Sequence, residues 1–199
     1  MSLNENSLLI QYQHEKNGKA RKEILENGNV EDKSIKLPLY LEALKDPEID
    51  NKALAIKFLG ELSDSESLLP LIELTQHRLE IYEDLISTIV TIMKKGDLEE
   101  IIPLFINNDN LNVRKSIPLI LGEFSNNTAK TYLIDLLHDK NTTVRKNAIK
   151  ALEKIADKED LDQIIVMLND EDLEVINQTI LVLGHIGVKE VIKPLINFL

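Results

Sequence analysis

Three lysines spaced four residues apart form the clearest group of like charges in the sequence. Lys146, Lys150 and Lys154 have the spacing that brings side chains onto one face of an α-helix. Residues 128–158 around them hold seven basic and four acidic side chains, whereas residues 159–189 hold one basic and seven acidic. This pattern indicates either a docking surface for an acidic partner, a pair of complementary charged patches, or a solvated helix face, and the solvated face is the preferred interpretation.

Catalytic and metal-binding chemistry has little support in the residue types. The chain has no Cys, which excludes zinc–thiolate sites, Fe–S clusters and Cys nucleophiles. It has no glycine-rich phosphate loop and no Gly-x-Ser-x-Gly elbow. The histidines, which show no His-x-x-x-His spacing, are His14, His77, His138 and His185. We therefore expect no enzyme activity and no catalytic, cofactor-binding or metal-binding residues.

A repeat of 31 residues organises the chain and explains most of these positions. Similar stretches begin at Asn107, His138 and Asn169, and the same step extends backwards through Leu59 and Val90 to give five copies with no change of step. Asn51 and Tyr82 then take the place of Val113. The best aligned columns are Val113, Val144 and Val175; Leu121, Leu152 and Leu183; and Phe124, Ile155 and Ile186.

Each repeat contains two helical patterns joined by a polar link. Residues 161–168 show the first, short apolar stripe, and residues 144–155 show the second, longer one. Asn or Asp recurs just before the second helix, where such side chains favour turns and N-caps because they satisfy free backbone N–H groups: Asp46, Asn108, Asp139 and Asp170. Glycine recurs near the end of the second helix, where a side chain would crowd the turn or the next repeat: Gly60, Gly122 and Gly184.

With these columns the repeat resembles the short HEAT-like repeat of many bacterial and archaeal proteins. The best matching residues are Asp139, Val144, Arg145, Ala148, Leu152 and Ile155. The resemblance covers residues 35–199 and is weakest in repeat two, which has Tyr82 and Glu83 in the motif places. It implies an all-α fold, an α-solenoid in which antiparallel helix pairs form a right-handed superhelix. Tetratricopeptide and ankyrin repeats fit less well, because their periods and signature residues differ.

The resemblance also implies roles for particular residues. Arg114 and Arg145 are expected to pair with Asp139 and Asp170 across the stack, rather than to bind an anionic ligand. The second helices of this family generally line the concave surface, where a partner would bind. The residues that we expect on that surface are Lys115, Ser116, Lys146, Asn147, Lys150, Lys154, Asn177 and Gln178.

The predicted domain organisation is one elongated stack. Residues 1–34 are expected to form a divergent helical cap, because the outer face of a first repeat has no neighbour. Residues 35–199 are expected to form five helix pairs and a final single helix as one continuous domain. That last helix, which begins near Pro194, either covers repeat five or meets a second molecule. A monomer is favoured, with a homodimer through this helix as the alternative.

Composition and charge narrow the classes of function. The chain is 43% apolar and 29% charged, with a net charge of −11, as in a foldable soluble protein. It shows no secretory signal and no run of about 20 apolar residues, which predicts a cytoplasmic protein without a membrane partner. The acidic net charge makes nucleic acid an unfavoured partner.

The predicted function is a non-enzymatic scaffold or adaptor that binds a protein partner through the concave face. HEAT-like repeats also occur in phycobilin lyases and in alkylpurine DNA glycosylases. The alternatives are therefore an accessory factor or enzyme of the phycobilin-lyase type and, less favoured, a nucleic-acid-binding protein.

Overall fold

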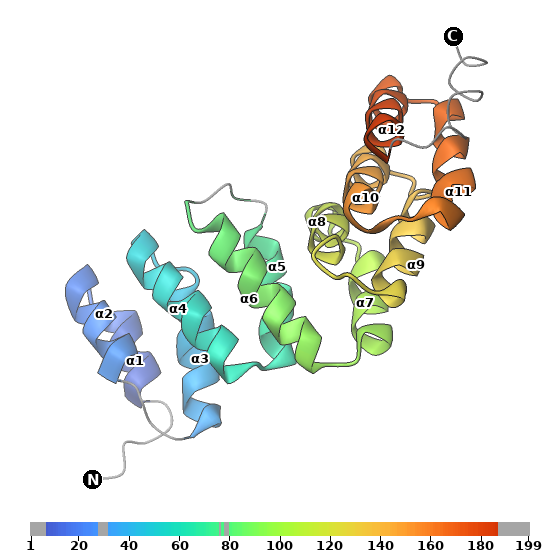
Figure 1. The fold of residues 1–199 in the computed structure, drawn as a ribbon. Helices are drawn as coiled ribbons and strands as arrows, with labels where there is room; N and C mark the ends of the chain where they lie inside the picture. Colours follow the sequence, from blue (N-terminus) through green and yellow to red (C-terminus); the bar gives the residue numbers. More distant parts are fainter. Residues whose placement is uncertain (1–6, 28–31, 76, 78–79, 187–199) are drawn as a thin grey trace. The chain divides into compact units, whose positions relative to one another are not determined.

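The protein is built from α-helices packed in pairs (Figure 1). The computed structural model contains twelve α-helices and no strand among the residues that it describes. These helices form two compact units, Met1–Asp97 and Leu98–Leu199. The all-α class and the paired helices of an α-solenoid are thus confirmed. The described residues are 7–27, 32–75, 77 and 80–186.

Unit 1 holds three helix pairs. Within it, α1 packs on α2, α3 on α4 and α5 on α6, and the second helices α2, α4 and α6 pack side by side in that order. The bounds of these helices are α1 Ser7–His14, α2 Gly18–Asn27, α3 Lys33–Ala43, α4 Ile49–Leu62, α5 Leu68–Leu74 and α6 Tyr82–Lys95.

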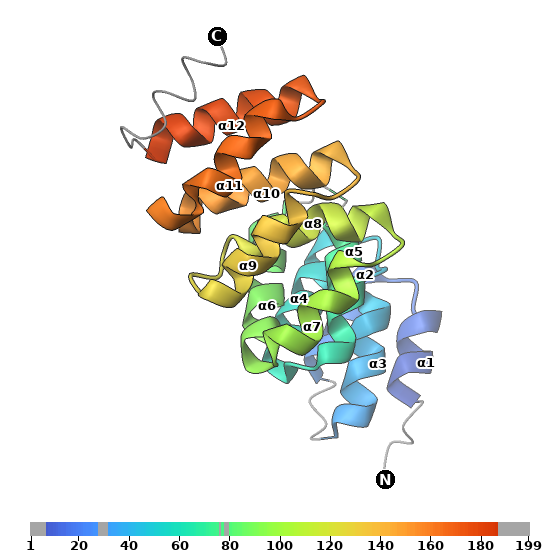
Figure 2. The same cartoon turned by 90° about the vertical axis from the view of Figure 1, so that its right-hand side faces the viewer.

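Unit 2 repeats the same arrangement with three further pairs. Here α7 packs on α8, α9 on α10 and α11 on α12, while the second helices α8, α10 and α12 lie next to one another, as Figure 2 shows. Their bounds are α7 Leu98–Ile106, α8 Leu111–Leu121, α9 Asn127–Leu136, α10 Thr142–Ile155, α11 Leu161–Ile165 and α12 Leu173–Ile186.

The repeat columns form the core of each unit. Each fully buried leucine contributes about 2 kcal/mol through removal of apolar surface from water. In the second helices, the buried column contains Leu59, Leu121, Leu152 and Leu183. In the first helices, a buried column keeps the step of 31 throughout and contains Tyr40, Leu71, Ile102, Leu133 and Ile164.

Helix α6 departs from the predicted step of 31. The sequence alignment placed Tyr82 in the column of Val113, but the structure puts the fully buried Leu85 there. The core of α6 lies three residues later than predicted, because the link before the helix is three residues longer and the link after it three residues shorter. The core residues of α6 are Leu85, Ile89, Val90 and Met93, which match Asn51, Ala55, Ile56 and Leu59 of α4.

The recurring Asp or Asn residues do not cap the second helices directly. Asp139 instead accepts a hydrogen bond from the N–H of Asn141 at 2.7 Å, and Asn141 caps α10 by accepting from the N–H of Thr143 at 3.1 Å. Asp46, Asn108 and Asp170 each accept from the N–H two residues later in the same way. Of the two predicted roles, turn and N-cap, these side chains take the first: each satisfies a backbone N–H in the turn before the cap.

The crowding predicted for the glycine column is confirmed at two of its three positions. A Cβ on Gly122 would lie 3.0 Å from the Cβ and 3.3 Å from the Cα of Ala151 in α10, and one on Gly60 would lie 3.2 Å from a methyl of Thr88 in α6. At Gly184 a Cβ meets no atom of the described residues within 4 Å, and crowding at this position stays a prediction.

The predicted C-terminal helix and the predicted division into a cap and one domain remain predictions. The predicted final helix near Pro194, with its covering or dimer-forming role, lies outside the described residues. The organisation of residues 35–199 as one continuous domain, with residues 1–34 as a cap, stays a prediction.

Candidate functional site

A buried polar network ties the first two helix pairs of unit 1 together. Asp46 is 4% exposed, and its carboxylate accepts hydrogen bonds from Arg21 Nε at 2.6 Å, Arg21 Nη2 at 3.0 Å, Asn51 Nδ2 at 3.1 Å and the Tyr12 hydroxyl. Burial alone raises the pKa of Asp46, but the hydrogen bonds outweigh it and lower the pKa to about 2. Burial and the bond to Asp46 raise the pKa of Tyr12, which therefore remains a donor. The network therefore holds the first two helix pairs together.

The same kind of ion pair joins the helix pairs of unit 2. Arg145 donates from Nε and Nη2 to the two carboxylate oxygens of Asp170, both at 2.8 Å. The Nε of Arg114 lies 3.6 Å from Asp139, and its Nη1 donates to the carbonyl of Asn108 at 2.7 Å. The predicted pairing across the stack is confirmed, and both arginines are structural. We call this series of ion pairs the arginine ladder.

Sequence reasoning missed Arg21 as a member of the arginine ladder. Arg21 lies three steps of 31 before Arg114, and its partner Asp46 follows it by 25 residues, as Asp170 follows Arg145. The repeat signature therefore reaches into the segment interpreted as a divergent cap, and the step of 31 was the signal that could have found it.

The predicted basic stripe lies on α10, and its lysines differ in their pairing. Lys146 pairs with Glu174 of α12, and Lys154 pairs with Glu123, just after α8, at 2.5 Å. Lys150 is exposed and has no ion pair with any residue that the structure describes. Two of the three lysines are thus paired with carboxylates of neighbouring repeats, and the pair of Lys146 with Glu174 agrees with the alternative of complementary charged patches.

The other predicted partner-binding residues also lie on the second helices of unit 2. Asn147 donates from Nδ2 to the carbonyl of Lys115 at 2.8 Å, so this side chain links α10 to α8. Ser116 is buried and donates to a carbonyl of its own helix, which removes it from the available surface. Asn177 is exposed and Gln178 half-buried on α12.

A groove of about 780 Å³ lies over the second helices of unit 1. Polar side chains dominate its lining, and among the described residues none of its charged groups forms an ion pair. The groove is acidic on balance. Its charged lining residues are Lys22, Lys57, Glu26, Asp50, Glu61 and Asp84, and its hydroxyl-bearing ones are Ser87, Thr88 and Thr91.

The groove of unit 1 and the predicted residues of unit 2 occupy the same repeat columns. With the shift of α6 included, Ala53 and Ser87 of the groove correspond to Lys115, Lys146 and Asn177. In the next column, Leu54 and Thr88 correspond to Ser116, Asn147 and Gln178. We call the side of the second helices that carries these columns the second-helix face. The sequence identified the columns, but it did not identify the unit in which they line a groove.

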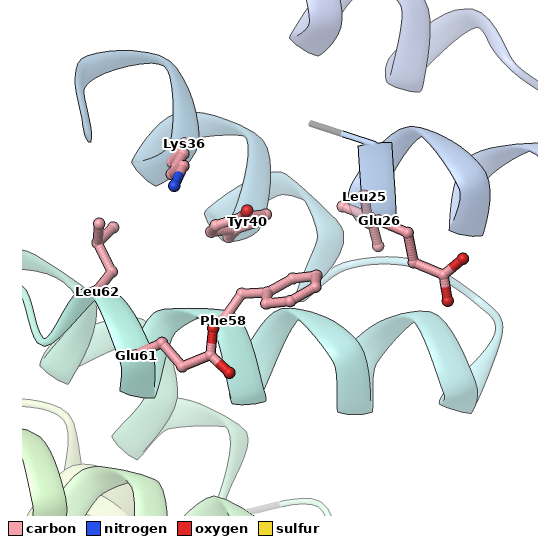
Figure 3. Close-up of a pocket in the computed structure, with 7 residues that line it drawn as sticks. All are labelled: Leu25, Glu26, Lys36, Tyr40, Phe58, Glu61 and Leu62. Carbon is pink, nitrogen blue, oxygen red and sulfur yellow. The ribbon is translucent and has the colours of Figure 1, made fainter. Parts of the chain in front are cut away.

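A second, smaller hollow of about 250 Å³ opens beside the groove (Figure 3). The rings of Tyr40 and Phe58 lie in contact in its wall, with centroids 5.0 Å apart and planes inclined at 31°. Burial, with a smaller contribution from the nearby Glu61, raises the pKa of Tyr40. Glu26 and Glu61 line both this pocket and the groove, so the two hollows adjoin. We call this hollow the aromatic pocket; its lining residues are Leu25, Glu26, Lys36, Tyr40, Phe58, Glu61 and Leu62.

The described segments lack the features of a metal site and of a membrane-spanning helix. Within residues 7–27, 32–75, 77 and 80–186, no three His, Asp or Glu side chains come together as metal ligands would. In those same segments, no helix has the length and apolar character needed to cross a membrane.

Comparison with known proteins identifies the repeat. Residues 98–178 match the family model of HEAT repeats, which confirms the resemblance for most of unit 2. Among solved structures, the X-ray structure of YibA from Escherichia coli is similar at 18% sequence identity and a TM-score of 0.46, over 98% of this chain and 86% of that chain. A comparison with curated proteins finds no match.

Proposed function

We propose that this HEAT repeat protein is a non-enzymatic scaffold that binds a protein partner through its second-helix face. In unit 1 the contact surface is the groove over α2, α4 and α6. Protein binding is a common role of HEAT repeats, and it agrees with a surface whose columns change residue type from one repeat to the next.

The observation that carries the proposal is the difference between the two units at equivalent columns. In unit 2, Lys146 and Lys154 are paired with Glu174 and Glu123, and of the basic stripe Lys150 alone has no ion pair with a described residue. In unit 1, the six charged groups of the groove have no ion pair with any described residue. Charges that are left unpaired on a concave surface are available to pair across an interface, where they set the orientation and association rate of the partner.

The chemistry of the groove supports binding rather than catalysis. Ser87, Thr88 and Thr91 line it, but the lining contains no His to act as a base for these hydroxyls. Thr91 also donates its hydroxyl to the carbonyl of Ser87 at 2.8 Å, as an ordinary helical threonine does. Hydroxyls and carboxylates in this arrangement are suited to hydrogen bonds with a peptide backbone and its polar side chains.

Site-specific photo-crosslinking in the cells that produce the protein tests the proposal. The crosslinking amino acid p-benzoyl-phenylalanine would replace Lys57 in the groove or, as a matched control, Leu69, which is 40% exposed on the first helix α5. We expect a discrete crosslinked protein from position 57 and none from position 69. The same species should weaken when Asp50 and Asp84 are both changed to Lys. Equal crosslinking at the two positions, or none at position 57, would contradict the proposal.

A further inference from the structure

The aromatic pocket beside the groove has the features of a site for one side chain of the partner. Resting on the proposed function, we propose that the pocket binds the guanidinium group of an arginine carried by the partner segment that lies in the groove. The hollow, at about 250 Å³, is smaller than the pockets of about 300–1,000 Å³ that hold drug-sized ligands. Its size therefore favours one side chain over a separate small molecule.

The walls of the pocket suit the long apolar stem and flat head of arginine. Leu25 and Leu62 supply aliphatic surface, and Tyr40 and Phe58 supply aromatic surface. Figure 3 shows Phe58 between the side chains of Glu61 and Glu26, beside Tyr40. A guanidinium plane stacks on such rings, whereas a lysine ammonium lacks this flat contact.

The hydroxyl of Tyr40 supplies a polar group in the wall of the pocket. Tyr40 is only 4% exposed, and its hydroxyl makes no hydrogen bond to any residue that the structure describes. No fully buried side-chain oxygen or nitrogen in that part of the chain lacks a partner. The hydroxyl therefore keeps some exposed surface, and since Tyr40 lines the pocket it can accept a hydrogen bond from a guanidinium N–H.

The charges around the pocket favour a cation. Glu26 and Glu61 are both exposed, and neither has an ion pair within the described segments. Lys36 also lines the pocket, but it is engaged in an interaction of its own. The two carboxylates are therefore available to accept charge-assisted hydrogen bonds from the forked N–H donors of arginine.

The pocket is placed so that an extended chain can reach it from the groove. Glu26 and Glu61 belong to both hollows, so a backbone that follows α4 along the groove passes the mouth of the pocket. Asp50 and Asp84, further along the groove, add negative charge for neighbouring basic residues of the same segment. The preferred occupant is thus a partner segment with an arginine as its anchor.

A titration with a defined peptide tests the inference on the full chain. The probe is the blocked peptide acetyl-Gly-Ser-Arg-Ser-Gly-amide, and the control peptide has citrulline, the neutral isostere, in place of arginine. Ring resonances of Tyr40 and Phe58 are followed by NMR at about 0.15 M ionic strength, where distant charges are screened. We expect arginine to bind about tenfold more tightly than citrulline, the loss that corresponds to removing charge-assisted hydrogen bonds.

Matched variants separate the pocket from the general acidity of the protein. Glu61→Gln and Glu26→Gln should each weaken arginine binding severalfold, and Glu23→Gln, which removes an exposed charge of α2 outside both hollows, should leave it unchanged. Equal binding of the two peptides, equal effects of Glu23→Gln and Glu61→Gln, or no ring shifts at peptide saturation would each overturn the inference. Crosslinking from Lys57 that persists despite such a result would leave the proposed function standing without the arginine anchor.

Discussion

The Asp46 network provides the strictest test of how the repeats are held together. We expect Asp46→Asn to destabilise unit 1 strongly, because it removes the counter-charge of Arg21, which is itself buried. Asn retains some hydrogen bonding but cannot accept the two charge-assisted bonds of the guanidinium group. The effect should be confined to α1–α4, the helices that contribute to the network or flank Asp46.

The magnitude follows from the ionisation of Asp46. Its pKa falls from 3.8 to about 2 on folding, which corresponds to about 2 kcal/mol of stabilisation of the charged form. The uncompensated charge left on Arg21 adds to this loss, and breaking a buried pair typically costs about 3–5 kcal/mol. We therefore expect the free energy of unfolding to fall by about 3 kcal/mol at pH 7.

The stability that ionised Asp46 contributes should fall as the pH is lowered. Because the folded pKa of Asp46 is depressed, its contribution is complete above the unfolded value of 3.8 and is lost as the pH falls towards 2. The difference in unfolding free energy between wild type and Asp46→Asn should therefore shrink by about 2 kcal/mol between pH 5 and pH 2. Other carboxylates titrate in both proteins and largely cancel in this difference.

Urea unfolding followed by circular dichroism measures the loss, and hydrogen exchange read by mass spectrometry localises it to α1–α4. Asp135→Asn, a change at an exposed aspartate of α9, is the control and should alter stability by less than about 0.5 kcal/mol. A variant as stable as wild type at pH 7, or a difference that stays constant from pH 5 to pH 2, would refute the reasoning.

Two further predictions concern packing and surface charge. Gly122→Ala should lower the free energy of unfolding by about 1 kcal/mol, because the backbone of Ala151 is too close to give way. Gly184→Ala, with no atom of the described chain near its Cβ, should raise the free energy of unfolding by about 0.5–1 kcal/mol through helix propensity. The two variants should shift the thermal midpoint in opposite directions, and shifts of the same sign would contradict this prediction. Lys154→Gln, which breaks an exposed pair with Glu123, should change stability by less than about 0.5 kcal/mol in urea unfolding, and a loss above 1 kcal/mol would show that the pair supports the stack.

The fold was predictable because the pattern of buried residues recurs in each helix pair. Val113, Val144 and Val175 have no exposed surface, as the columns required. The shift of α6 was hidden because three residues are close to one helical turn of 3.6, so apolar residues recur near the core at both registers. Val90 fits the leucine column in the sequence, although Met93 occupies that column in the structure.

The groove and the aromatic pocket were less predictable. In the pair formed by α5 and α6, Leu71 and Ile92 take the places of Tyr40 and Phe58, and both are buried. The sequence shows this exchange of aliphatic for aromatic residues, but the hollow beside the rings depends on how α2, α3 and α4 pack, which the columns do not specify. The same applies to Lys146 and Lys154, whose pairing with neighbouring repeats follows from helix spacing rather than from composition.

The buried and the exposed columns of the second helices therefore differ in how much their residue types vary between repeats. The ladder position keeps arginine at residues 21, 114 and 145, because a buried aspartate in the next repeat needs a counter-charge. The second-helix face has no such requirement, and one of its columns holds Ala53, Ser87, Lys115, Lys146 and Asn177 in succession. A partner segment that does not repeat can be recognised only by a surface that does not repeat. The variation in this column, on a scaffold held constant by the ladder, is what a binding function requires.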